Sequence, residues 1–393
     1  MAGGRAWRGV SLAALLCGLG TPALGAPRDE GGRLWVEAKQ LSVHKERSAL
    51  SQVARTAMPA VVSITTTPAT PSAGADGEAQ NGIGSGLIIH PDGYILTSAH
   101  VIEGAGVITI SVFSEQGHPE KFQAELVGED ERTDFALLKI DAGRKLPVLK
   151  LASASRVDVG DWVVVIGNPF GLTHSVTAGV VSAKGRTDVT PNGRDGDFDY
   201  MQVDASINPG NSGGPVLDVH GDVVAIANAV NVAGQGIGFA IPVDIAKVVV
   251  PHLQKYGRVR RGWMGVSVLD CTPDAIEAYG LARTRGVVVS EVTDGGPASR
   301  AGLQVGDVIE GLDTSKVDRA ARLRWQVASR GVGRSVLLRV RRGERPLKLR
   351  VKLEELPGEV QELVPTLAAP SKGAHPEEQP GMGGSGSPDA PSP

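Results

Sequence analysis

The stretch GNSGGPVL at residues 210–217 decides both the fold and the chemistry that this sequence can support. A serine hydroxyl is a poor nucleophile unless a base takes its proton, and the oxyanion that then forms needs fixed backbone N–H donors. Glycines on both sides of Ser212 let the backbone approach a substrate and aim such donors. The stretch therefore predicts a nucleophilic serine, with a glycine-rich turn and an idle serine as the plainer alternative.

Residues 210–214 also fit the G-x-S-x-G nucleophile elbow of α/β-hydrolases. That fold requires a helix directly after the serine and the chain order serine, acid, histidine, which Asp244 and His252 could formally supply. The residues that follow are instead Pro-Val-Leu, a turn at 220–222 and a second β-branched run. Because this pattern is typical of a β-hairpin, we reject the elbow.

Around this stretch, short apolar runs recur from residue 82 to 241 and are separated by turn sequences such as Pro-Asp-Gly at 91–93. No long helical period lies between them, which favours antiparallel barrels or a sandwich over a parallel α/β sheet. The predicted strands are 59–64, 87–89, 95–98, 107–113, 135–140, 162–166, 176–181 and 223–227.

Two residues upstream of Ser212 could supply the base and its partner. His100 follows a predicted strand, and Asp134 opens a hydrophobic run after a charged turn. Each is weak on its own, because a lone histidine is usually a surface or core residue and Asp134 could simply begin a strand. Together they give the chain order His100, Asp134, Ser212, which is the order used by chymotrypsin-like double barrels.

Five motifs, in the same order along the chain, resemble the HtrA (Deg) family of serine proteases. They are TSAHV at 97–101, DFAL at 134–137, GNPFG at 167–171, DASINPGNSGGP at 204–215 and GFAIP at 238–242. The resemblance runs from about residue 59 to 242. It implies a mainly β fold whose protease domain is a trypsin-like double β-barrel with the cleft between the barrels.

Carried over to this chain, the resemblance implies that Ser212 attacks the scissile carbonyl and that His100 acts as general base and then as general acid. Asp134 orients His100, and the N–H groups of Gly210 and Ser212 form the oxyanion hole. These residues are the catalytic residues that the sequence predicts.

The sequence predicts some residues of the substrate pocket. In trypsin-like domains its floor lies six residues before the nucleophile, here at Ser206. A neutral Ser206 offers no partner to Lys or Arg. Ile207 and the loop at 228–231, which contains Ala229 and Val230 and by the resemblance forms the pocket wall, indicate a shallow apolar pocket for side chains such as Val, Ala or Leu. The alternative for the apolar residues is plain barrel core.

Residues 262–354 resemble a PDZ domain, through RGWMGV at 261–266, GVVV at 286–289, GPASRAGL at 296–303 and GDVI at 306–309. The resemblance implies a peptide-binding loop formed by Trp263, Met264, Gly265 and Val266. Its N–H groups would grip a terminal carboxylate, while a strand edge pairs with the peptide. Two departures stand out: LDTS at 312–315 replaces the usual Asn-Gly turn, and Met264 stands where leucine is commoner.

The N-terminus predicts export. Arg5 and Arg8 precede an apolar run at 10–19, and small residues follow before a possible cut ahead of Ala26, with an uncleaved interfacial anchor as the alternative. No later stretch is long and apolar enough to span a bilayer, so no integral membrane segment is predicted after cleavage. The predicted parts are a signal peptide at 1–25, a polar segment at 26–45, a protease domain at 46–257 closed by a helix at 243–256, a PDZ domain at 258–355 and a disordered Pro/Gly/Ser-rich tail at 356–393.

The composition excludes other classes. The 393 residues contain 40 Lys and Arg against 43 Asp and Glu, so no basic excess points to nucleic acid. Two cysteines, Cys17 and Cys271, are too few for a disulfide scaffold, and the cut would leave Cys271 alone. Other glycine clusters lack the crossover helix and the acidic residue of a nucleotide site. No cofactor or metal site is predicted, because the remaining histidines are scattered on turns and tails: His44, His90, His118, His174, His220, His252 and His375.

Taken together, the resemblance implies an exported serine endopeptidase that degrades unfolded or misfolded proteins in protein quality control, with the bacterial periplasm as the expected compartment. It also implies C-terminal peptides as PDZ ligands, and a homotrimer or a multiple of trimers. A hypothesis from another class is a chaperone or peptide-binding stress sensor in which proteolysis is latent or minor. The loops at 187–199 and 228–236 have compositions flexible enough to become ordered only when a ligand binds.

Overall fold

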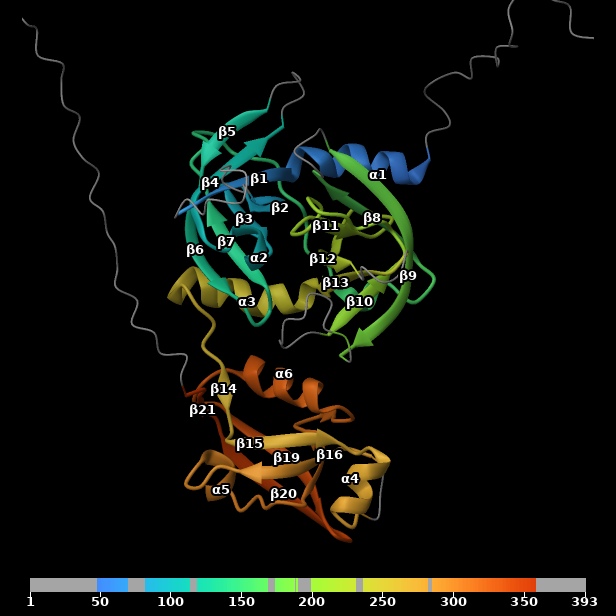
Figure 1. Cartoon of the computed structure of the whole chain (residues 1–393), viewed down its shortest axis with the longest axis vertical. Helices are drawn as coiled ribbons and strands as arrows, with labels where there is room; N and C mark the ends of the chain where they lie inside the picture. Colours follow the sequence, from blue (N-terminus) through green and yellow to red (C-terminus); the bar gives the residue numbers. More distant parts are fainter. Residues whose placement is uncertain are drawn as a thin grey trace, which may run out of the picture. The chain divides into compact units, whose positions relative to one another are not determined.

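A computed structural model describes residues 48–69, 82–113, 119–168, 174–187, 189, 199–230, 236–281 and 285–357. The described chain is mainly β, with two barrel-like sheets followed by a smaller α+β domain (Figure 1). The predicted signal peptide, the tail at 358–393 and most of the loops at 187–199 and 231–236 lie outside the described residues.

The first barrel is a seven-stranded antiparallel sheet in the order β5-β4-β1-β2-β3-β7-β6. A helix that the sequence did not predict, α1 (Ala49–Ala57), and the 3-10 turn η1 (Met58–Ala60) lead into it. Its elements are β1 (Val61–Pro68), β2 (Gly82–His90), β3 (Tyr94–Thr97), α2 (Ala99–Ile102), β4 (Ala105–Val112), β5 (Glu120–Gln123), β6 (Glu125–Asp130) and β7 (Phe135–Lys139).

The second barrel is closed, in the order β10-β13-β12-β11-β8-β9. The predicted hairpin after Ser212 is confirmed, because β11 pairs antiparallel with β12. The predicted closing helix is also confirmed, as α3 (Val243–Tyr256). The other elements are η2 (Ala154–Arg156), β8 (Trp162–Gly167), β9 (Ser175–Arg186), β10 (Tyr200–Val203), β11 (Pro215–Leu217), β12 (Val223–Val230) and β13 (Gly238–Pro242).

Apolar side chains join the two barrels into one body. Each barrel has its own buried cluster, and a third cluster contains residues of both, among them Leu87 and Phe135 of the first barrel and Ile166 and Ile226 of the second. Leu253 of α3 belongs to the same cluster. Since burying a large apolar side chain stabilises a fold by roughly 1.5–3 kcal/mol, this shared core holds the facing edges of the barrels at fixed positions.

The last domain is a five-stranded antiparallel path, β15-β16-β17-β19-β20, in which β15 is an edge strand. The short β18 pairs with β17, and β14 pairs with β21. The elements are β14 (Gly262–Trp263), β15 (Val266–Asp270), α4 (Pro273–Ala278), β16 (Val287–Val292), α5 (Pro297–Arg300), β17 (Val308–Leu312), β18 (Ser315–Lys316), α6 (Ala320–Arg330), β19 (Ser335–Arg342), β20 (Arg345–Lys352) and β21 (Glu354–Glu355).

Two local predictions were wrong. The strand predicted at 59–64 begins at Val61 and continues to Pro68, because Thr65 and Thr66 pair with β2 on one side and β4 on the other. The segment from Asn228 to Val230, predicted to be part of a flexible loop, continues β12 and pairs with β13. In both places neighbouring strands supplied hydrogen bonds that the local sequence does not reveal.

Candidate active site

His100 and Asp134 form a tightly hydrogen-bonded pair in the first barrel. Nδ1 of His100 lies 2.6 Å from Oδ2 of Asp134, and the backbone N–H of His100 donates to Oδ1 at 2.8 Å. The Asp134 side chain is 6% exposed and that of His100 is 20% exposed. The buried carboxylate therefore fixes the imidazole at two points, while the imidazole itself reaches solvent.

The backbone conformation of Asp134 helps to hold its side chain next to His100. Its φ of 52° lies in the left-handed region, which is uncommon for residues other than glycine. In this conformation its carbonyl accepts a hydrogen bond from the N–H of Ala99 at 3.1 Å, and its own N–H donates to the carbonyl of Glu131 at 3.2 Å. The turn before β7 and the first residues of α2 are thus tied together.

The loop that carries Ser212 is held by the first barrel as well as by the second. The N–H of Ser85, in β2, donates to the carbonyl of Ser212 at 2.9 Å. A Cβ atom at Gly213, where φ is 82°, would lie 2.3 Å from both the Ser85 carbonyl and the Thr97 hydroxyl. Only glycine fits here, which gives a physical reason for the second glycine of the motif.

The hydroxyl of Ser212 points to a neighbour that the sequence did not predict. It donates to the backbone carbonyl of Asn228 at 3.0 Å, and within the described residues it makes no hydrogen bond to His100. In the same part of the chain, the N–H groups of Gly210 and Ser212 donate to no protein acceptor. The two predicted oxyanion donors therefore have no acceptor within the residues that the structure describes.

The residues predicted to form the substrate pocket differ in their exposure to solvent. Ser206 is exposed, and its carbonyl accepts a hydrogen bond from the Thr177 hydroxyl at 2.8 Å. Ile207 is 3% exposed, belongs to the core of the second barrel and packs against Gly238. The side chains of Ala229 and Val230 lie outside the described residues.

The sequence analysis did not predict the contacts of three buried polar residues around the site: Ser85, Tyr200 and Asn228, the last of which it placed only in the expected pocket wall. Ser85 contacts the Ser212 loop, and Asn228 contacts Asp134 through its side-chain amide. Tyr200 donates to Asn228. All three lie on strands without a recognisable motif, so no local signal could have identified them.

Asp130, four residues before Asp134, forms a buried ion pair with Arg261. The Arg261 guanidinium donates to both carboxylate oxygens of Asp130 at 2.7 Å, and both side chains are under 7% exposed. The hydroxyl of Thr133 also donates to Asp130. Arg261 immediately precedes β14 and Asp130 ends β6, so the pair joins these two positions of the chain.

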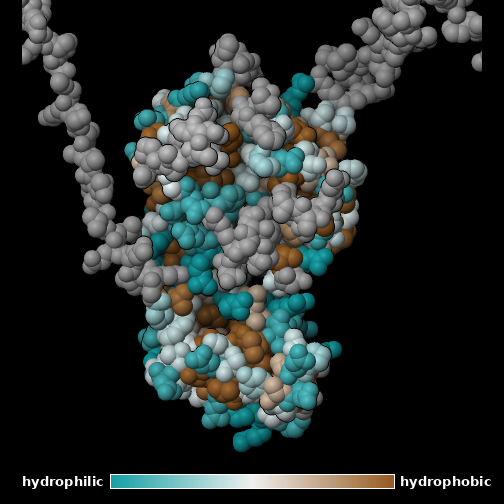
Figure 2. All heavy atoms as spheres, in the orientation of Figure 1, coloured by the Kyte–Doolittle hydropathy of each residue, from teal (hydrophilic) through white to brown (hydrophobic). Residues whose placement is uncertain are grey.

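The peptide-binding loop predicted at 263–266 joins β14 to β15. Met264 is buried, and the N–H groups of Met264 and Gly265 donate to no acceptor within the described residues. The loop opens onto a cavity of about 180 Å³ that is also lined by Val268, Leu323 and Val327. Apolar residues gather over the face of this domain where β15 and α6 lie (Figure 2). An edge strand, free N–H groups and an apolar cavity are what a peptide terminus requires.

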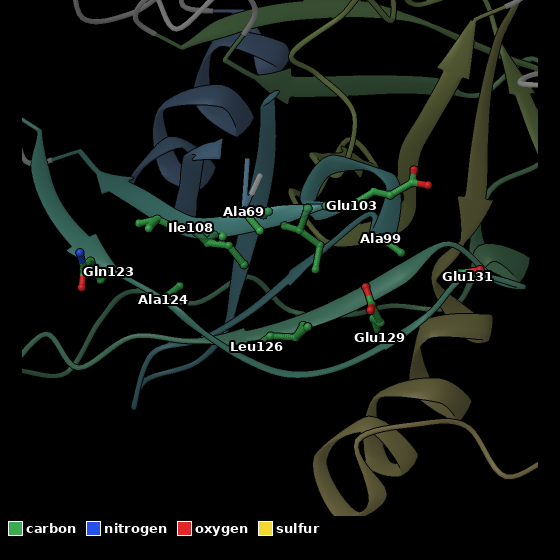
Figure 3. A pocket seen from close by; sticks show the side chains of 14 residues that line it. Ala69, Ala99, Glu103, Ile108, Gln123, Ala124, Leu126, Glu129 and Glu131 are labelled. Carbon is green, nitrogen blue, oxygen red and sulfur yellow. The ribbon is translucent and has the colours of Figure 1, made fainter. Parts of the chain in front are cut away.

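A larger cavity of about 490 Å³ in the first barrel is lined by residues of α2, β4 and β6 (Figure 3). Ala99, next to His100, is in its wall, and three carboxylates gather toward one end: Glu103, Glu129 and Glu131. Burial, together with the charges of Glu131 and Glu103, raises the pKa of Glu129. The sequence analysis did not identify this cavity.

Among the described residues, no group of three or more His, Cys, Asp or Glu side chains could hold a metal ion. In the same residues, no helix has the length and apolar character needed to cross a membrane.

Comparisons with known proteins agree with this architecture. The sequence model of the trypsin-like peptidase domain matches residues 84–226, and that of the PDZ domain matches residues 262–353. A solved structure described as the HtrA-type protease AlgW with decapeptide is 35% identical, with a TM-score of 0.64, and the match covers 78% of this chain and 99% of that one. This chain belongs to the HtrA family.

Other HtrA relatives give the same result. The serine endoprotease of Yersinia pestis is 32% identical over 79% of this chain and all of its own, with a TM-score of 0.58. A protein of Pseudomonas savastanoi pv. phaseolicola named "Probable periplasmic serine endoprotease DegP-like" is 43% identical over 284 residues, or 72% of this chain. One of the same name from Hahella chejuensis is 40% identical over 285 residues. The matches span only 57% and 59% of these two curated relatives.

Proposed function

We propose that this HtrA chain is an exported serine endopeptidase that degrades unfolded or misfolded proteins in protein quality control. The observation that carries the proposal is the 2.6 Å pairing of His100 with Asp134, because a buried carboxylate that orients an imidazole is what a serine nucleophile requires of its base. The membership of the family and the names of the relatives support it.

In the proposed mechanism, Ser212 Oγ attacks the scissile carbonyl carbon while Nε2 of His100 takes the hydroxyl proton. The N–H groups of Gly210 and Ser212 hold the oxyanion, and Asp134 stabilises the imidazolium. The C–N bond then breaks as His100 gives its proton to the leaving amine. Water, deprotonated by His100, hydrolyses the acyl-enzyme in the same way and restores Ser212.

In this proposal, a pocket in the protease domain determines substrate specificity, and the loop of the PDZ domain regulates activity. Ser206, Ile207, Ala229 and Val230 would form a shallow apolar pocket, and the loop at 263–266 would bind C-terminal or hydrophobic peptides. A periplasmic location follows from the N-terminal pattern at 1–25 and from the relatives' names. The homotrimer remains an expectation from the family, and light scattering that shows a monomer would contradict it.

A second candidate function is that of a chaperone or peptide-binding stress sensor whose proteolysis is latent. One observation favours it: the Ser212 hydroxyl is bonded to the Asn228 carbonyl and not to His100. In this arrangement the serine hydroxyl is not hydrogen-bonded to its base, which is what latent proteolysis requires. Suppression of aggregation by Ser212→Ala would support chaperone activity beside proteolysis.

The test is digestion of casein, a loosely structured protein, by the wild-type chain and by Ser212→Ala, each with and without a peptide that ends in a hydrophobic residue. The proposal expects cleavage by the wild type, greater cleavage when the peptide is present, and none by the variant. Loss of such a nucleophile costs up to ~10⁶-fold in turnover. Equal cleavage by both proteins would refute the assignment of Ser212.

A further inference from the structure

Asn228 is a buried polar residue at a β-bulge beside the candidate active site. Its exposure is 2%. In the pairing of β12 with β13, Ala227 lies opposite Ala240 and Ala229 opposite Phe239, so Asn228 is the inserted residue. A bulge re-aims the side chain of the inserted residue and interrupts the ladder, and bulges are common next to active sites.

Asn228 contacts two of the three residues to which the chemistry is assigned. Its side-chain Nδ2 donates to Oδ2 of Asp134, the same oxygen that lies 2.6 Å from Nδ1 of His100. Its backbone carbonyl accepts the hydrogen bond of the Ser212 hydroxyl at 3.0 Å. A single residue therefore touches the carboxylate on one side and the nucleophile on the other.

Tyr200 fixes the orientation of the Asn228 amide. The tyrosine hydroxyl donates to Oδ1 of Asn228 at 3.3 Å, and the ring, which is 2% exposed, packs against Phe239 with their centroids 5.6 Å apart. Burial and the negative charge of Asp134 raise the pKa of Tyr200, so its hydroxyl keeps the proton that it donates. A flipped amide would turn its oxygen toward the carboxylate, and oxygen lone pairs would then face each other.

We propose that Asn228 is a positioning residue for the hydrolysis described under Proposed function, on which this inference rests. Its amide, held by Tyr200, fixes the Asp134 carboxylate and through it the His100 imidazole. Its carbonyl holds the Ser212 hydroxyl in a resting arrangement that the hydroxyl must leave before His100 can take its proton. Asn228 does not itself exchange a proton or touch the substrate in this scheme.

A merely structural role would also bury this amide, so the test has to separate positioning from stability. Asn228→Leu keeps the branched shape and removes the donor, while Tyr200→Phe keeps the ring and removes the hydroxyl. Tyr94→Phe, at a partly exposed tyrosine of β3, is the matched control. Cleavage of a fluorogenic peptide gives kcat and KM, and circular dichroism checks the fold.

We expect Asn228→Leu to lower kcat on the order of 10- to 100-fold with little change in KM, well short of the ~10⁴-fold cost of losing the carboxylate that keeps the imidazole in the correct tautomer. Tyr200→Phe should lower kcat by a smaller factor. In the Asn228→Leu background, Tyr200→Phe should have no further effect, because it acts through the amide. Tyr94→Phe should leave both constants unchanged.

Wild-type kcat in a folded Asn228→Leu protein would overturn the inference, and so would multiplicative effects in the double variant. If Asn228→Leu does not fold, Tyr200→Phe decides, and a wild-type kcat in that variant overturns the inference. Failure of the proposed function looks different: the wild-type chain itself would then cleave nothing, and Ser212→Ala would match it.

Discussion

The hydroxyl of Ser85 in the first barrel donates a hydrogen bond to the carbonyl of Gly210 in the second, at 2.5 Å. The hydroxyl oxygen of Ser85 also accepts a hydrogen bond from the backbone N–H of Asn168 at 2.8 Å, and Ser85 is fully buried. Gly210 has a φ of 101°, so its backbone is held in a conformation that other residues rarely adopt. The orientation of the predicted oxyanion loop therefore depends on a side chain from the opposite barrel.

Replacing Ser85 by alanine should impair catalysis more than folding. Ser85→Ala leaves two buried backbone groups without their partner, at a cost of roughly 1–3 kcal/mol each. We expect kcat to fall on the order of 10- to 100-fold, which is less than the ~10²–10³-fold cost of removing an oxyanion donor outright, because Ser85→Ala only loosens the donor. Steady-state kinetics beside urea unfolding measures both effects, and an unchanged kcat would mean that the Gly210 peptide is held without Ser85.

The buried pair of Asp130 and Arg261 should be strongly coupled. Asp130→Leu leaves a buried guanidinium without its two-point acceptor, and breaking such a pair destabilises a protein by about 3–5 kcal/mol. Asp130→Leu combined with Arg261→Met removes both charges and should recover most of that loss. Urea midpoints of the two variants measure this, and equal destabilisation of the single and double variants would show that the pair is not coupled.

His174 should make the stability depend on pH. Burial lowers the pKa of its imidazole, although Nε2 is paired with the Val61 carbonyl at 3.0 Å and the ring packs on Phe113. The unfolded chain therefore takes up a proton at higher pH than the folded chain does. The stability that His174 contributes is full above the unfolded pKa of about 6.5 and falls as the pH drops below it.

Melting temperatures between pH 7.5 and 5.5 test this expectation. His174→Gln should lose less stability than the wild type over that interval, while His220→Gln, at an exposed turn, should follow the wild type. If His174→Gln shows the same pH dependence as the wild type, burial of this histidine does not account for it.

The sequence predicted the fold class correctly, because turn chemistry and short apolar runs are local signals. A mainly β double barrel followed by a PDZ domain was expected and is confirmed. The helix α1 was missed because it is only nine residues long and begins in a polar, weakly patterned stretch, although its buried residues Val53, Ala54 and Ala57 recur at helical spacing. The residues His100 and Asp134, 34 positions apart, could be proposed from chain order and motif, and they lie together.

The remaining contacts of the site could not be predicted, because they depend on how distant strands are packed. Ser85 meets Gly210 across 125 residues, and Asn228 meets Asp134 across 94. Neither residue lies in a motif that specifies such a partner. The bulge that turns Asn228 inward is a property of its pairing with β13, which the sequence of β12 alone does not contain.

The most direct test of the account is the reaction of the wild-type chain with a fluorophosphonate, which phosphonylates a serine activated by a base and an oxyanion hole. We expect one label per chain, located on Ser212 by mass spectrometry, and a loss of labelling in His100→Ala. Labelling of another serine, or cleavage of casein by a chain that the fluorophosphonate does not label at Ser212, would contradict the account.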